Sequence, residues 1–286
     1  MLFVRFRVYP ACMASARPST KAYILSPDRR MRNPDLIPSL EHLKIPFEII
    51  DKSSVPNTLE YLLTQNKTQS KDSPFTIQQL ACTYGHYLMH QEALRGIDEW
   101  ALFFENDATI DTDLLILLLD SVEMLPNGLI LLGSCGGWAR KNKTVELSEL
   151  AIHKVFNSAV TGSHAYLMKT SLLKQFIGVE QDLISLADEF IRESLPMFVT
   201  KPFVSYQEGF TPSEIPLETS TSKGSSLRRI SSAIFADLRD YPRLGRFGNR
   251  LLRLEFFERL LGNVLMKLDG CNLYHQAQIG SSKDQE

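Results

Sequence analysis

Short apolar runs that alternate with helix-like segments are the feature that most constrains how this chain folds. The runs predicted as strands are 22–25, 47–50, 100–104, 128–133 and 165–168. Segments with apolar residues at helical spacing lie between most of them. Strands that alternate with helices are typical of a mostly parallel sheet covered by helices, and such sheets bind ligands beyond the carboxyl ends of their strands. The sequence therefore predicts an α/β fold with a ligand site at that edge.

Two of the predicted helices have start signals. The pair Asn33-Pro34 resembles an N-cap with proline at the first helical position, which predicts a helix to about Lys44. Thr76 to Gln79 is a capping-box pattern, and helical spacing continues to about Arg95. Other segments expected to be helical are 59–63, 114–124, 172–176 and 183–195, and a short edge strand is expected at 197–199.

The composition excludes several classes of protein. The chain has 286 residues and a net charge of -2 at pH 7, so its overall charge gives no case for binding nucleic acid. No apolar run nears the roughly 20 residues that span a bilayer, which argues against an integral membrane protein. The four cysteines show no C-x-x-C pair and no metal-finger spacing. This argues against a disulfide scaffold or a structural zinc site and favours a reducing, cytoplasmic location.

Composition also divides the chain into five parts. We expect an N-terminal tail at 1–20, an α/β domain at 21–216, a Ser/Thr/Gly-rich linker at 217–227, a basic segment at 228–268 and a C-terminal tail at 269–286. Residues 223–267 hold ten basic and four acidic side chains, a net charge of +6, interspersed with leucine and phenylalanine. A basic amphipathic helix of this kind can lie on anionic lipid, or it can be a helical subdomain packed on the core. The sequence leaves both open.

An acidic pair follows the central apolar run. Glu105 and Asp107 stand on either side of Asn106, just past the predicted strand 100–104. Carboxylate oxygens are the ligands that Mg²⁺ and Mn²⁺ prefer, and a cation held there can neutralise a diphosphate. Acidic pairs at strand ends are also common as solvated turns or helix caps.

Four segments carry a family resemblance by their order and spacing. They are QLACTYGH at 79–86, FFENDATI at 103–110, GSHAYLM at 162–168 and LADEF at 186–190. Over roughly residues 21–216 the chain resembles glycosyltransferase family 25, which includes lipooligosaccharide glycosyltransferases and collagen galactosyltransferase domains. Glu105 and Asp107 match the outer acids of the family's acidic motif, with Asn106 in place of the middle acid. The first strand departs from the family, whose Ile-Asn-Leu is Ile24-Leu25-Ser26 here.

The resemblance implies a GT-A (Rossmann-like) architecture, a UDP-sugar donor, usually UDP-galactose, and inversion at the anomeric carbon. Glu105 and Asp107 would hold Mn²⁺ or Mg²⁺ against the leaving diphosphate. Asp188, with Glu189 as the second candidate, would accept the proton of the acceptor hydroxyl. The positions expected to contact donor or substrate are Arg29, Arg30, His86, Glu105, His164 and Tyr166, the arginines through charge-assisted bonds to phosphate.

Ordinary structural roles compete with these assignments. His86 inside a helix is equally compatible with a packing histidine, and His164 with a strand cap. Asp188 and Glu189 fit a solvated helix face as well as a catalytic base. The pair Arg29-Arg30 fits surface charge. Each side chain is therefore a candidate whose surroundings decide its role.

The sequence thus predicts a metal-dependent, inverting glycosyltransferase that moves a hexose, galactose first, from a UDP-sugar to a saccharide or glycolipid acceptor of lipooligosaccharide type. We expect a bacterial cytoplasmic enzyme at the inner face of the membrane, which 228–268 would contact. Asn106 and the altered first strand support a second hypothesis, a non-catalytic member of the fold that binds a sugar nucleotide or a partner. A metal-dependent phosphohydrolase is a third, and it requires a second metal-binding cluster that the sequence does not show.

Overall fold

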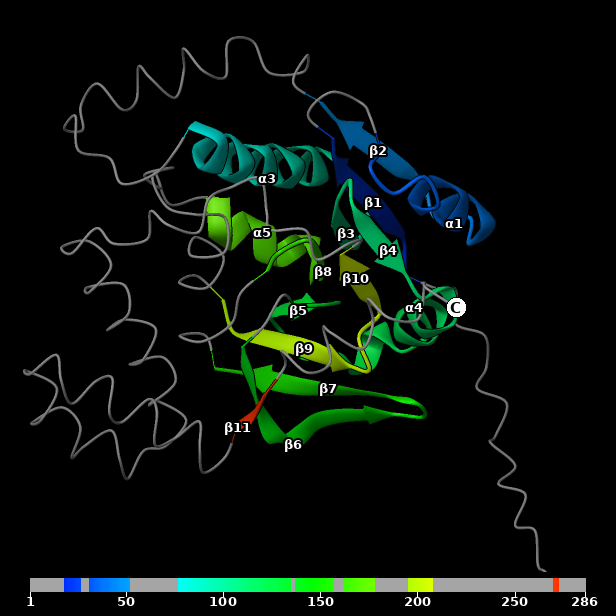
Figure 1. Ribbon diagram of the computed structural model, residues 1–286, viewed down its shortest axis with the longest axis vertical. Helices are drawn as coiled ribbons and strands as arrows, with labels where there is room; N and C mark the ends of the chain where they lie inside the picture. Colours follow the sequence, from blue (N-terminus) through cyan, green and yellow to red (C-terminus); the bar gives the residue numbers. More distant parts are fainter. Residues whose placement is uncertain are drawn as a thin grey trace, which may run out of the picture.

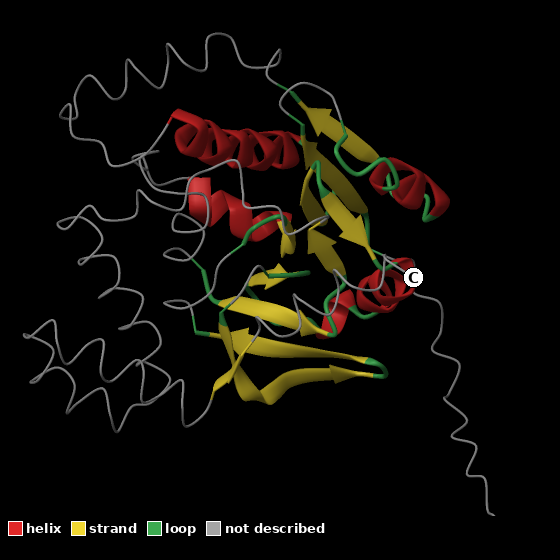
Figure 2. Ribbon diagram, viewed as in Figure 1, coloured by secondary structure: helices red, strands yellow, loops and turns green. Residues whose placement is uncertain are grey.

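A central nine-stranded sheet organises the chain, as a computed structural model shows (Figures 1 and 2). The structure describes residues 18–26, 31–51, 77–134, 137–156, 162–177, 195–207 and 270–272. The strand order is β11-β6-β7-β9-β5-β8-β3-β1-β2. In chain order these strands are β1 (Thr20–Leu25), β2 (Phe47–Ile50), β3 (Trp100–Glu105), β5 (Leu129–Leu131), β6 (Trp138–Leu147), β7 (Leu150–Val155), β8 (Ala165–Lys169), β9 (Met197–Lys201) and β11 (Gly270–Asn272).

The strand directions confirm the prediction of an α/β sheet only in part. β2, β1 and β3 pair in parallel, as do β5 and β9. β8 lies antiparallel between β3 and β5, and β7, β6 and β11 follow with antiparallel pairings. Six strands of the described sheet (β1, β2, β3, β5, β6 and β9) therefore run one way and three (β7, β8 and β11) run the other. The sheet is mixed, because β8 returns directly beside β3.

The prediction of an edge strand at 197–199 is wrong. β9 lies inside the sheet, between β5 and β7, and four of its five residues are buried. The hairpin of β6 and β7 extends the sheet beyond it, and the sequence analysis had not identified that hairpin. β6 contains the polar run Arg140 to Thr144, which hides its strand character because it gives no apolar alternation.

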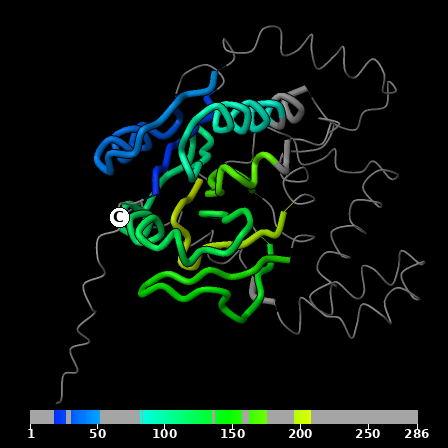
Figure 3. The backbone as a smooth tube through the Cα atoms, turned by 180° about the vertical axis from the view of Figure 1, so that it is seen from behind, coloured from blue at the N-terminus to red at the C-terminus, as the bar shows by residue number. Residues whose placement is uncertain are grey.

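Helices cover both faces of the sheet. The described helices are α1 (Leu36–His42), α3 (Ile77–Arg95), α4 (Thr112–Asp120) and α5 (Thr170–Ile177), with a 3₁₀ turn η2 (Val122–Met124). α3 lies against α5 and β1, and Figures 1 and 3 show these two helices stacked on one side. One buried cluster joins α1 and α4 to the sheet, and a second joins α3 and α5 to it. Alternate residues of β3 enter the two clusters, Leu102 and Phe104 the first, Ala101 and Phe103 the second, as the two-residue period of a strand requires.

The helix boundaries follow the predictions closely at α3 and less closely elsewhere. α3 ends at Arg95, as expected. The helix predicted from Asn33-Pro34 begins only at Leu36. The Asn33 carboxamide makes hydrogen bonds from the segment before this helix. Its oxygen accepts from the Asp35 backbone N–H at 2.9 Å, and its nitrogen donates to the Ala108 carbonyl oxygen at 2.8 Å. The segment 114–124 is helical, but the helix ends at Asp120 and η2 follows.

A second, two-stranded sheet pairs β4 (Ala108–Ile110) antiparallel with β10 (Ser205–Gln207). It brings residue 207 beside the acidic segment that follows β3. The expected helix at 59–63, all of the expected helix 183–195 except Leu195, and the basic segment 228–268 lie outside the described residues. Within the described part, no helix combines the length and the apolar character needed to cross a membrane.

Candidate active site

The acidic segment lies where the sequence predicts it, at the carboxyl end of a buried central strand. Glu105 is the last residue of β3, and Asp107 directly precedes β4. The Asn106 carbonyl oxygen accepts from the backbone N–H groups of Arg32 and Asn33, both at 3.0 Å. The Glu105 N–H donates to the His164 carbonyl oxygen at 2.7 Å. These bonds fix the turn that carries both carboxylates.

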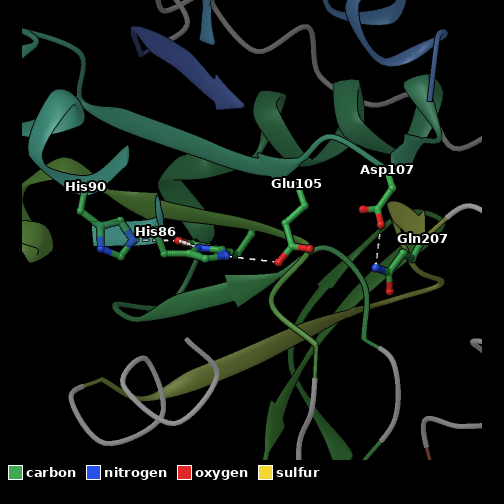
Figure 4. A network of polar contacts seen from close by, with 6 residues as sticks. His86, His90, Glu105, Asp107 and Gln207 are labelled. Carbon is green, nitrogen blue, oxygen red and sulfur yellow. Dashed lines mark hydrogen bonds and ion pairs between the residues drawn. The ribbon is translucent and has the colours of Figure 1, made fainter. Parts of the chain in front are cut away.

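Glu105 is held by a histidine from α3. His86 Nε2 lies 3.2 Å from Glu105 Oε1, with 1% of the histidine side chain and 25% of the carboxylate side chain exposed (Figure 4). Burial alone would raise the pKa of Glu105. The hydrogen bond from His86 and the charges of His86, His164 and Arg32 outweigh it, so the pKa is lowered. Glu105 is therefore an ionised acceptor, and His86 Nε2–H donates to it.

Behind His86 lies a buried row of polar rings. The Tyr166 hydroxyl is 3.0 Å from His86 Nδ1 and 2.7 Å from His90 Nε2, and all three side chains are fully buried. Burial lowers the pKa of His90 well below 6.5, so its ring is neutral. His86 and His90 share one face of α3 because they are four residues apart. The contacts therefore form one row that runs from His90 through Tyr166 and His86 to Glu105.

Asp107 is held from the other sheet. Gln207 Nε2, on β10, donates to Asp107 Oδ2 at 2.9 Å (Figure 4). The second oxygen, Oδ1, is buried and accepts no hydrogen bond from the described part of the chain. Burial, and then the negative charge of Glu105, raise the pKa of Asp107, while Gln207, His164 and Arg32 oppose the shift. The two carboxylates therefore repel each other, and one buried oxygen has no donor among the described residues.

His164 lies beside both acids. Its ring is buried, and its positive form would stabilise the charge of each carboxylate. A close backbone approach makes room for it at Gly133, just past β5. A Cβ added to Gly133 would lie 2.0 Å from the Ser205 carbonyl oxygen and 2.8 Å from His164 Nε2. Only glycine fits there without moving the backbone at the first residue of β10.

The residues present fit a hard divalent cation between the acids. An orphaned buried carboxylate oxygen and a repelling pair of carboxylates are both stabilised by a cation, and oxygen donors suit Mg²⁺ and Mn²⁺. Of the predicted site residues, Glu105, Asp107, His86, His164 and Tyr166 lie at this one edge. Arg29, Arg30, Asp188 and Glu189 lie outside the described residues.

Sequence reasoning missed several contributors. Gln207 is 100 residues from Asp107, and no local pattern connects them. Arg32 acts on both acids from the segment before α1. His90 had a usable signal, since it lies one helical turn after His86 on the same face.

The family assignment follows from a match over more than half of the chain. Residues 19–191 match the family model described as Glycosyltransferase family 25 (LPS biosynthesis protein). The chain belongs to glycosyltransferase family 25. This membership confirms the family and the class of enzyme, a glycosyltransferase, that the sequence predicts. No curated protein matches the sequence of this family 25 chain.

Several solved structures are similar to this family 25 chain at low identity. S. aureus TarS 1-349 has a TM-score of 0.37 and 13% identity, over 63% of this chain and 57% of that one. The same protein in complex with UDP-GlcNAc has a TM-score of 0.37 and 14% identity, over 63% and 55%. A197 from STIV has a TM-score of 0.33 and 13% identity, over 63% and 80%. The match spans little more than half of TarS, and likenesses this weak do not bear on the site.

Proposed function

We propose that this chain is a metal-dependent, inverting GT-A glycosyltransferase that transfers a hexose, galactose first, from a UDP-sugar to a lipooligosaccharide-type acceptor. One observation carries the proposal: Asp107 Oδ1 is buried and receives no hydrogen bond from the described residues, beside a second, ionised carboxylate at the sheet edge where α/β folds bind ligands. Family membership supplies the reaction class.

Asp107 and Glu105 are the residues that would hold Mn²⁺ or Mg²⁺. Asp107 offers Oδ1, and Glu105 offers the carboxylate oxygen that His86 does not occupy. A cation bound there supplies the positive charge that stabilises a departing nucleotide diphosphate. Gln207 holds the other oxygen of Asp107, which leaves Oδ1 as the one directed to the ligand.

His86 and Tyr166 contribute by position. Both are fully buried and bond to each other, and His86 holds Glu105 ionised and in one orientation. A carboxylate fixed in this way does not have to be ordered when substrate binds, which is the advantage of a preorganised site. Direct contact of these two side chains with the donor stays a prediction. The charge of His164 acts on both acids, so His164 is the better candidate for a donor contact.

The remaining roles rest on the sequence. Asp188, with Glu189 second, would accept the proton of the acceptor hydroxyl as it attacks the anomeric carbon from the face opposite the diphosphate. Arg29 and Arg30 would bind the diphosphate. The basic segment 228–268 would hold the enzyme to anionic lipid at the inner face of the bacterial membrane, near a glycolipid acceptor.

UDP release from UDP-galactose in the presence of Mn²⁺ tests the proposal. We expect Asp107→Asn to lower metal-dependent kcat/KM by at least about 100-fold, since it removes a charge from the site. Asp113→Asn, an exposed acid on α4, is the matched control and should keep full activity. Full Mn²⁺-dependent turnover in Asp107→Asn would refute the assignment of Asp107. Absence of turnover with every UDP-sugar tested, together with no Mn²⁺-dependent UDP binding, would refute the enzyme proposal.

A further inference from the structure

A cysteine that the proposed transfer does not use lies next to Glu105 and His86. The ligand atoms of Cys82, His86 and Glu105 all lie within 4.8 Å of one another. Cys82 and His86 are four residues apart on α3, so they project from the same face of the helix toward the end of β3. Cys82 forms no disulfide and is partly exposed. Sulfur, nitrogen and oxygen donors thus converge at a point that solvent can reach.

We infer that Cys82, His86 and Glu105 form a site for a thiophilic divalent cation, Zn²⁺ in the first place, separate from the oxygen-rich position at Asp107. Thiolate, imidazole and carboxylate are the ligands of Zn²⁺, and three protein ligands leave a fourth position for water. Asp107 does not belong to this group. The donor sets select different metals, because a thiolate favours Zn²⁺ while carboxylates alone favour Mg²⁺ or Mn²⁺.

The spacing suits a tetrahedral ion. Bonds of 2.0 to 2.3 Å in tetrahedral geometry place ligand atoms about 3.4 Å apart. His86 Nε2 and Glu105 Oε1 are already 3.2 Å apart. Since every pair of ligand atoms lies within 4.8 Å, the Cys82 sulfur has to approach by about 1.4 Å at most. A rotation of the cysteine side chain supplies a movement of that size.

A hydrogen-bonded support for the histidine ligand is in place. Ligating histidines donate their other ring N–H to a fixed partner, and the Tyr166 hydroxyl lies 3.0 Å from His86 Nδ1. When Nε2 binds the ion, the single ring proton of His86 is on Nδ1 and is donated to the Tyr166 oxygen. The Tyr166 hydroxyl then donates to His90 Nε2, 2.7 Å away. The Cys82 thiol proton goes to solvent, so binding releases one proton and strengthens with pH.

Glu105 belongs both to this cluster and to the acidic pair that we propose holds Mn²⁺ or Mg²⁺. The expected effect of Zn²⁺ on activity therefore rests on the proposed function. Zn²⁺ bound to Cys82, His86 and Glu105 would neutralise the charge of Glu105, one of the two carboxylates proposed to hold Mn²⁺ or Mg²⁺. We therefore expect Zn²⁺ to inhibit Mn²⁺-dependent transfer through this cluster.

Co²⁺ replaces Zn²⁺ as a spectroscopic probe in the direct test, carried out on the reduced full-length chain. Thiolate ligation produces a near-ultraviolet charge-transfer band, which we expect to saturate at one Co²⁺ per chain and to be displaced by one equivalent of Zn²⁺. Cys82→Ser should abolish the band, and Cys271→Ser is the matched control that should retain it. Tyr166→Phe should weaken Zn²⁺ binding by about 10-fold to 100-fold, the usual loss for an outer hydrogen-bond partner.

The outcomes separate this inference from the proposed function. A band that persists in Cys82→Ser, or a wild-type chain that shows none, overturns the cation site whatever the enzymatic activity is. If the band depends on Cys82, the site stands even where no UDP release is detected. With activity in hand, the Zn²⁺ concentration for half-inhibition should rise at least about 10-fold in Cys82→Ser. An unchanged value overturns the proposed inhibition.

Discussion

Replacing Tyr166 by phenylalanine tests whether the buried row of polar rings holds Glu105 in place. The substitution keeps the aromatic ring, whose centroid is 4.8 Å from that of Phe103, and removes only the hydroxyl. That hydroxyl lies 3.0 Å from His86 Nδ1 and 2.7 Å from His90 Nε2, in a region without solvent access. Two buried imidazole nitrogens therefore lose their partner together.

The expected loss of stability follows from the two imidazole nitrogens left without a partner. Each buried polar group left without a partner costs roughly 1 to 3 kcal/mol. Removal of the hydroxyl's own desolvation offsets part of the sum, so we expect a loss of about 2 to 4 kcal/mol in the free energy of unfolding. This is a large fraction of the roughly 5 to 15 kcal/mol that stabilises a domain. With a urea m-value of roughly 3 kcal/mol/M, the midpoint should fall by about 1 M.

Urea denaturation followed by circular dichroism measures this loss. Tyr206→Phe is the matched control, because it removes a hydroxyl from a half-buried ring that packs against Phe203. We expect it to change the free energy of unfolding by less than about 0.5 kcal/mol. If Tyr166→Phe unfolds at the same urea concentration as the control, the row does not fix the histidines, and its role behind Glu105 is refuted.

Three further predictions concern packing, pH and the metal. Gly133→Ala should destabilise by about 3 kcal/mol or more in urea, since its Cβ would lie 2.0 Å from the Ser205 carbonyl oxygen. Burial lowers the pKa of His90 well below 6.5, so below about pH 6.5 the unfolded chain binds a proton that the folded chain does not. The free energy of unfolding should be highest above that pH and fall by up to roughly 1.4 kcal/mol for each pH unit below it. His90→Phe should make the urea midpoint less dependent on pH. Gln207→Leu should raise the Mn²⁺ concentration for half-maximal UDP release by about 10-fold to 100-fold, since it frees Asp107.

Each of these predictions has a control of the same residue type. Gly96→Ala places its Cβ no closer than 3.1 Å, to the Tyr23 hydroxyl, and should be tolerated; equal losses at both glycines would contradict the clash at Gly133. His42→Gln, at an exposed position, should leave the pH dependence intact. If the urea midpoint of His90→Phe falls with decreasing pH as steeply as that of the wild type, a group other than His90 causes the pH dependence. Gln91→Leu should leave the Mn²⁺ requirement unchanged, and an unchanged requirement in Gln207→Leu argues against Asp107 as a ligand.

The sequence by itself determined the elements that a local pattern encodes. The apolar runs that become β1, β3, β5 and β8 are visible because a strand buried on both faces has few polar residues. The spacing in α3 fixed its end at Arg95. The order of the motifs gave the family, and the acidic pair was correctly placed past the central strand.

Only the tertiary structure decided which strands are neighbours and what each carboxylate touches. β8 lies antiparallel beside β3, and β9 lies within the sheet. Strands pair through backbone groups along their edges, and every residue type except proline carries the same backbone groups, so a strand's own composition does not identify its neighbour. The Asn33 side chain donates to a carbonyl oxygen 75 residues away, a contact that its position before α1 does not predict. Tyr166 meets His86 across 80 residues and Gln207 meets Asp107 across 100, and no periodicity extends that far along a chain. The donors around both acids therefore exist only once the two sheets and α3 have packed together.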